Sequence, residues 1–168
     1  MRWIWIDRIL ELKRGERCAA IKNISLAEDV LHDHFPAAEH GPAQAVMPNT
    51  LIIEGMAQTA GILVGHAQDF REKVILAKVG KARFENVARP GHCLRFEVTL
   101  DRLDEHGAST SGQVLRIDPA DGTTVRLAVI NLTFSHVDQN LSGLDFPEHN
   151  FVFTEQFMDV LRQSGFAE

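Results

Sequence analysis

Two side chains of this 168-residue sequence, Glu54 and His34, have the chemistry and the setting of an acid–base pair. Glu54 lies in an otherwise apolar segment, where desolvation is expected to raise the pKa of a carboxyl group. Such a group is suited to general acid catalysis near neutral pH. The alternative is a structural one, in which Glu54 lies on a narrow exposed side of a helix and bonds Gln58 one turn later.

His34 precedes Phe35-Pro36, a dipeptide whose proline restricts the local backbone. Its imidazole could serve as the base, although a single loop histidine is more often structural or at the surface than catalytic. His32 and His40 raise the question of a metal site. No third ligand and no acidic partner follow at a suitable spacing, so we predict no metal.

The elements that must position these residues are one helix and a set of strands. A helix is predicted from a cap at Asn49 or Thr50 to about Asp69, and its nearly continuous apolar surface indicates a buried helix. Residues 25–49 predict an ordered irregular segment. Strands are predicted at 3–12, 17–24, 74–84, 93–103, 109–117 and 124–134, the first two as a hairpin and the last four as an antiparallel meander.

Four sequence blocks, in the same order, resemble the 3-hydroxyacyl-ACP dehydratases of the FabZ type. His34-Phe35-Pro36, Met47-Pro48 and the run Leu51 to Gln58 are similar to the family signature G-H-F-P-G-x-P-x-M-P-G-x-L-x-x-E-A-M-A-Q. The other blocks, similar to the opening strand, the second strand and the K-A-R-F…P-G-D segment of the family, are Ile6–Leu12, Ala20–Ile24 and Lys81–Phe84 followed by Pro90-Gly91-His92.

The resemblance implies an α+β hot-dog fold, with an antiparallel sheet wrapped around a long central helix, and an active site at a dimer interface. His34 would remove the C2 proton, and Glu54 of the other subunit would assist departure of the C3 hydroxyl. A backbone N–H at the helix start, at Asn49 and Thr50, would polarise the thioester carbonyl, as a helix N-terminus is suited to do. Gln58, Pro48 and Phe35 would support these groups, and no cofactor is implied.

The implied partners are an acyl carrier protein and a second copy of this chain. Members of this family often form trimers of dimers, and the sequence does not settle the oligomer. The substrate tunnel and the acidic carrier are expected to meet Phe84, Lys81, Arg83 and Arg89. Three departures from the family pattern are present. Asp33 and Asn49 replace family glycines, an insertion lies within residues 37–45, and the segment beyond Asp138 has no counterpart in the short family members.

Length and composition restrict the classes of protein to which this sequence could belong. The length suits one folding unit, which we divide into a hot-dog domain at 1–138 and an extension at 139–168 whose short helix, starting near Thr154, packs on that domain. A net charge of −6 argues against a nucleic-acid-binding surface. Cys18 and Cys93 fit neither a zinc site nor a disulfide framework, so a cytoplasmic protein is expected. No apolar run is long enough for a membrane span.

Two other functions remain open at this point. The first is a hot-dog thioesterase, which the presence of both His34 and Glu54 with their flanking blocks disfavours. The second is a non-catalytic hot-dog protein that binds an acyl chain or pairs with an active subunit. The changes at Asp33 and Asn49 and the insertion keep this alternative open.

Overall fold

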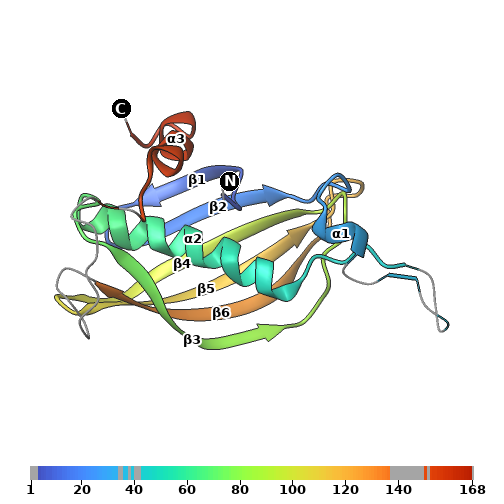
Figure 1. Cartoon of the computed structure of the whole chain (residues 1–168), viewed down its shortest axis with the longest axis horizontal. Helices are drawn as coiled ribbons and strands as arrows, with labels where there is room; N and C mark the ends of the chain where they lie inside the picture. Colours follow the sequence, from blue (N-terminus) through green and yellow to red (C-terminus); the bar gives the residue numbers. More distant parts are fainter. Residues whose placement is uncertain are drawn as a thin grey trace.

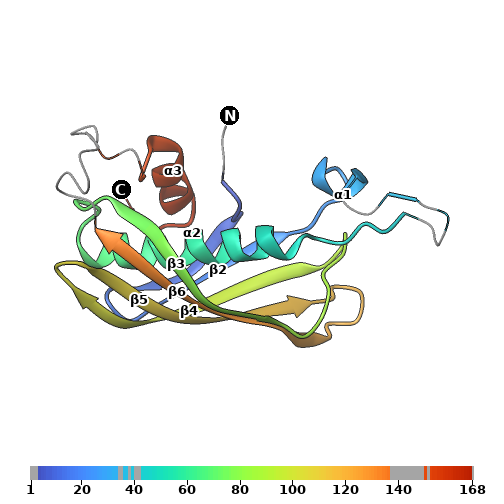
Figure 2. The same cartoon turned by 60° about the horizontal axis from the view of Figure 1, so that its bottom comes forward.

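A six-stranded antiparallel sheet lies against one long helix, α2 (Asn49–Ala67), in the computed structural model of the chain (Figure 1). The structure describes residues 4–33, 36–37, 39, 43–136, 150 and 152–167. Figure 2 shows the shorter helices α1 and α3 on the same side of the sheet as α2. The bounds of the other elements are β1 (Arg8–Lys13), β2 (Arg17–Asn23), α1 (Val30–Asp33), β3 (Val74–Phe84), β4 (Cys93–Asp104), β5 (Gly107–Ile117), β6 (Thr124–His136) and α3 (Glu155–Gln163).

The strand order in the sheet is β1-β2-β4-β5-β6-β3, and every neighbouring pair is antiparallel. The β1–β2 hairpin and the α+β class are confirmed. The predicted four-strand meander is wrong in one respect: β4, β5 and β6 form a meander, but β3 pairs with β6 at the far edge. The connection from Glu85 to His92 therefore crosses from one side of the meander to the other instead of closing a hairpin.

Three local predictions also need correction. Pro48, rather than Asn49 or Thr50, is the residue before the first turn of α2, and its side chain makes no capping hydrogen bond. The first strand starts at Arg8, because the Trp5 N–H donates to the side chain of Gln58 (2.8 Å) instead of to a neighbouring strand. Within the segment expected to be irregular, α1 forms a single turn that buries Leu31.

Two glycines let α2 approach the sheet closely. A Cβ atom at Gly55 would overlap the ring of Phe96, which is fully buried on β4. A Cβ atom at Gly112 on β5 would overlap the thioether end of Met56. Packing at this density leaves no room for an added methyl group, so these contacts fix both the height and the position of the helix.

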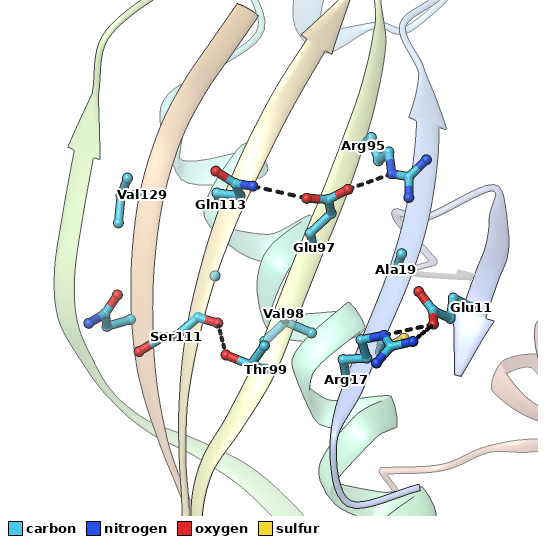
Figure 3. A pocket seen from close by; sticks show the side chains of 13 residues that line it. Glu11, Arg17, Ala19, Arg95, Glu97, Val98, Thr99, Ser111, Gln113 and Val129 are labelled. Atoms are coloured by element: carbon cyan, nitrogen blue, oxygen red, sulfur yellow. Dashed lines mark hydrogen bonds and ion pairs between the residues drawn. The ribbon is translucent and has the colours of Figure 1, made fainter. Parts of the chain in front are cut away.

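The face of the sheet away from α2 is polar. Strand register places Ala19, Glu97, Gln113 and Val129 in one row across four strands, and the next row on this face contains Thr99 and Ser111. Figure 3 shows Gln113 donating to Glu97 (3.0 Å), which also pairs with Arg95 (2.8 Å). Because these charged groups have partners within the face, we read the shallow cavity there, about 490 Å³, as a solvated surface.

The packing at Gly55 predicts a large difference between two glycines of the same helix. Gly55→Val should destabilise the fold by about 1–3 kcal/mol, the usual cost of overpacking a core. Gly61→Ala, whose Cβ would have Phe134 as its nearest neighbour at 4.0 Å, should be neutral or stabilising by up to about 1 kcal/mol. Urea unfolding of both variants checks this, and equal stabilities would contradict the packing account.

Candidate functional site

Glu54 lies at a groove on the flank of α2, which we call the helix-flank groove. The groove has a volume of about 400 Å³ and runs between α2, the helix-facing sides of β3 and β6, and the segment after residue 150. Glu54 is half-buried, and most of its neighbours there are apolar. The residues that line the groove are Ile4, Glu54, Ala57, Gln58, Gly61, Val74, Leu76, Phe134, Val152, Phe153, Thr154, Gln156 and Phe157.

The buried amide of Gln58 orients Glu54. The Gln58 carbonyl oxygen accepts from the Trp5 N–H at 2.8 Å, so the amide nitrogen must face the other way, and it donates to Oε1 of Glu54 at 2.8 Å. Oε1 of Glu54 is thereby engaged as an acceptor, and the carboxyl group is held in one orientation. The bond set out as the structural alternative is present, but it does not withdraw Glu54 from the groove.

A second cavity, the helix-start pocket, lies at the N-terminus of α2 and has a volume of about 460 Å³. The N–H groups of Asn49 and Thr50 have no acceptor within the helix, since the first helical bonds are those from Leu51 and Ile52 to the Pro48 carbonyl. Free N–H groups and the helix dipole favour negative charge at this point. The lining residues are Gln44, Val46, Met47, Pro48, Asn49, Thr50, Val87 and Arg89.

Backbone hydrogen bonds between distant segments build this pocket. The N–H of the buried residue Met47 donates to the Ala88 carbonyl at 2.9 Å, which places the chain before α2 beside the loop after β3. In that loop the Arg89 N–H donates to Nδ1 of His92 (3.0 Å), and the Gly91 N–H donates to the Ile24 carbonyl (2.9 Å). Arg89 is therefore held at the start of α2.

Among the residues that the structure describes, none lines both cavities. Asn49 and Glu54 are five positions apart on α2, which turns their side chains by about 140° relative to each other. The groups expected to polarise a carbonyl and to donate a proton thus face different spaces in one chain. A site that used both would need a second chain to supply one of them.

The remaining predicted site residues fall into two sets. His34 and Phe35 lie outside the described residues, as do the boundary at 138 and four of the nine residues 37–45 that contain the insertion; in the sequence, His34 comes directly after α1. Phe84, at the end of β3, is half-buried, whereas Lys81 and Arg83 are exposed on that strand and Arg83 is paired with Glu85. Arg89 is the one predicted cationic contact that lines either cavity.

Sequence reasoning missed several residues of the helix-flank groove. Gly61 follows Glu54 by seven positions, so helical periodicity alone would place it on the same side of α2. Val152 and Phe157 gave no comparable signal, because nothing in the sequence links residues near 155 to the middle of a helix a hundred positions earlier. Trp5, which the sequence predicts within a strand, instead donates its N–H to Gln58 and orients that amide.

Comparison with known proteins identifies the family. A sequence model of the FabA-like domain matches residues 3–125. The 3-hydroxyacyl-[acyl-carrier-protein] dehydratase FabZ of Caldanaerobacter subterraneus subsp. tengcongensis is 38% identical over 102 residues, which are 60% of this chain and 68% of that protein. The chain belongs to the FabA-like family. The FabZ of Paracidovorax citrulli is 35% identical over 119 residues, or 68% of this chain and 77% of the relative. These relatives confirm the resemblance to FabZ-type dehydratases.

Solved structures with the same fold are more distant in sequence. The dehydratase heterocomplex ApeI:P from Xenorhabdus doucetiae matches with a TM-score of 0.59 and 16% identity, covering 81% of this chain and 84% of that one. An acyl-CoA hydrolase from Staphylococcus aureus matches with a TM-score of 0.57 and 14% identity, covering 89% and 84%. At these identities the likeness concerns the fold, and the expected hot-dog fold is confirmed.

No helix in the described part of the chain is long and apolar enough to cross a membrane. Within the same ranges, no three His, Cys, Asp or Glu side chains are grouped so that they could hold a metal ion.

His92 makes the helix-start pocket sensitive to pH. Burial, and next the nearby guanidinium of Arg116, lower its pKa below the ordinary value of 6.5, while Asp118 acts in the opposite direction. Neutral His92 accepts the Arg89 N–H, so its contribution to stability is fully present above pH 6.5 and is lost as the pH falls through the lowered pKa.

Wild type should therefore lose more unfolding free energy than His92→Asn between pH 7.5 and 5, because the asparagine carbonyl, attached at Cγ as Nδ1 is, can accept the same bond without titrating. Urea unfolding at several pH values measures this difference. Parallel pH profiles for the two proteins would contradict the assigned role of His92.

Proposed function

We propose that this chain is a hydro-lyase that converts 3-hydroxyacyl-ACP into trans-2-enoyl-ACP in fatty-acid-type biosynthesis. The observation that carries the proposal is Glu54, a carboxyl group oriented by Gln58 at an apolar groove, in a chain that belongs to the FabA-like family. Free thiols at Cys18 and Cys93 suit the cytoplasm, the compartment we propose for it.

The reaction needs three groups. His34 takes the C2 proton, and the electron pair left behind forms the C2–C3 double bond as the C3–O bond breaks. Glu54 gives its proton to the departing hydroxyl, which leaves as water. Negative charge that develops on the thioester oxygen is stabilised by the free N–H groups of Asn49 and Thr50 at the start of α2. No added cofactor is required by these steps.

A second copy of the chain completes the site in this proposal. The two edges of the sheet differ: at β1 the Ile9 N–H donates to the hydroxyl of Ser164 (2.9 Å), so the C-terminal segment covers that edge. At the other edge β3 offers eleven residues, with Leu76 and Val79 exposed. A long open strand edge is a template for pairing with another chain.

Pairing of two β3 strands about a twofold axis would place the helix-flank groove of each chain near the partner's helix start. His34 and Asn49 of one chain then act with Glu54 of the other. Assembly of such dimers into trimers of dimers, as in the resembled family, is compatible with this arrangement.

The carrier protein is the source of the substrate in this proposal. An acidic carrier would be attracted by cationic side chains near the entrance, even though the net charge of the chain is −6. Arg89 suits this role best because it lines the helix-start pocket, where the thioester would lie. Lys81 and Arg83, on the exposed edge strand, are the further contacts we propose.

Dehydration of 3-hydroxybutyryl-ACP by the purified chain, followed by absorbance of the conjugated product, tests the function. Wild type should turn over, and His34→Ala and Glu54→Gln should each lose about a hundred- to ten-thousand-fold in kcat, the usual contribution of positioned proton transfer. Folding of each variant is verified by its unfolding curve.

His106→Ala and Glu105→Gln at the exposed β4–β5 turn repeat the same chemical changes at residues that line neither cavity and should retain full activity. A wild-type chain that is inert at every chain length would support the non-catalytic acyl-binding alternative. Release of free ACP thiol without an enoyl product would support the thioesterase.

A further inference from the structure

The helix-flank groove is closed at one end by aromatic residues from the C-terminal segment. Val152, Phe153 and Phe157 all line it, and Phe153 is only 8% exposed. The Phe153 ring makes edge-to-face contacts with Phe70, at a centroid distance of 4.9 Å, and with Phe157, at 6.1 Å. These contacts form a continuous apolar wall across the groove, which we call the C-terminal wall.

Hydrogen bonds and buried side chains hold this wall in place. The Asn150 amide nitrogen donates to the carbonyls of Phe70 and Glu72 (3.0 and 3.1 Å), and its oxygen accepts from the N–H groups of Val152 and Phe153. Farther along, Leu161 of α3 is fully buried. The segment is therefore a fixed part of the groove, and it lies beyond residues 3–125 that the family model matches.

Two glycines on α2 show where the groove is open and where it ends. A Cβ atom at Gly65 would overlap the rings of Phe153 and Phe70, so no space remains beside that residue. A Cβ atom at Gly61 would have Phe134 as its nearest neighbour at 4.0 Å, and Gly61 lines the groove. The open path thus leads from Glu54 past Gly61 and stops at the C-terminal wall, before Gly65.

We propose that the C-terminal wall sets the maximum acyl chain length of this enzyme, an inference that rests on the proposed dehydratase function. The substrate tail lies along α2 from Glu54, passes Gly61 and ends against Phe157 and Phe153. Eleven helical positions separate Glu54 from Gly65, about 16 Å. An extended chain advances about 1.25 Å per carbon, given bonds of about 1.5 Å. The groove therefore accepts roughly a dozen carbons beyond C3.

The test compares kcat/KM across 3-hydroxyacyl-ACP substrates from four to eighteen carbons, each expressed relative to the four-carbon substrate of the same variant. Phe157→Ala removes part of the wall, so the chain length at which the relative kcat/KM falls should increase. Gly61→Leu fills the middle of the groove, so that chain length should decrease. Each methylene that loses or gains burial should change the ratio roughly fourfold.

Two matched variants control for general effects. Phe166→Ala removes an aromatic ring from the same C-terminal segment without touching the groove and should leave the ratios unchanged. Gly61→Ala adds only the Cβ that the groove can accommodate and should shift the decline less than Gly61→Leu. Binding of the matching acyl-pantetheine thioesters, measured by calorimetry on every variant, provides a readout that does not need catalysis.

The outcomes separate the two proposals. If wild type is active but Phe157→Ala and Gly61→Leu keep the wild-type length profile, the C-terminal wall has no role in chain-length selection and the dehydratase proposal survives. If wild type is inert at every length, the proposed function fails. In that case the calorimetric length profile alone decides: a shift supports an acyl-binding groove ended by the wall, and an unchanged profile overturns it.

Discussion

The close approach of α2 to the sheet is the constraint on which the rest of the structure depends. It is possible only because Gly55 meets the ring of Phe96 and Gly112 meets Met56 without intervening side-chain atoms. With one side of the helix fixed against β4 and β5, Glu54 and Gly61 face the flank, and Asn49 and Thr50 face the loop that carries Arg89. The packing of α2 against the sheet therefore determines which cavity each of these residues faces.

In a single chain the helix-flank groove and the helix-start pocket are separate, and the two cavities differ in the chemistry of their linings. Glu54 and its orienting amide, Gln58, lie along an apolar groove, which in the proposed reaction holds the fatty tail beside the proton donor. The free N–H groups of Asn49 and Thr50 lie in the pocket beside Arg89, which in the same proposal receives the thioester oxygen. The edges of the sheet show the same asymmetry, since Ser164 covers β1, whereas no strand of the described residues pairs with the outer edge of β3.

Much of the architecture was predictable because local patterns decide it. The apolar surface of 51–64 requires a buried helix, and turn residues bound β4, β5 and β6 closely. The position of β3 was not predictable from turn chemistry, although Lys78, Lys81 and Arg83 give this strand the charge typical of an edge. Family motifs supplied His34 and Glu54 as candidates. The C-terminal wall could not be foreseen, because contacts such as those of Phe153 with Gly65 join segments with no shared local pattern.

The central claim is that each active site combines His34 of one chain with Glu54 of its partner, and mixed dimers test it most directly. His34→Ala and Glu54→Gln chains would be co-expressed with different affinity tags, and dimers carrying both tags would be isolated and assayed. Each mixed dimer should hold one intact site and one doubly altered site, giving about half of the wild-type activity from two nearly inert parents. Mixed dimers as inactive as their parents would contradict the account, because both residues would then belong to one chain.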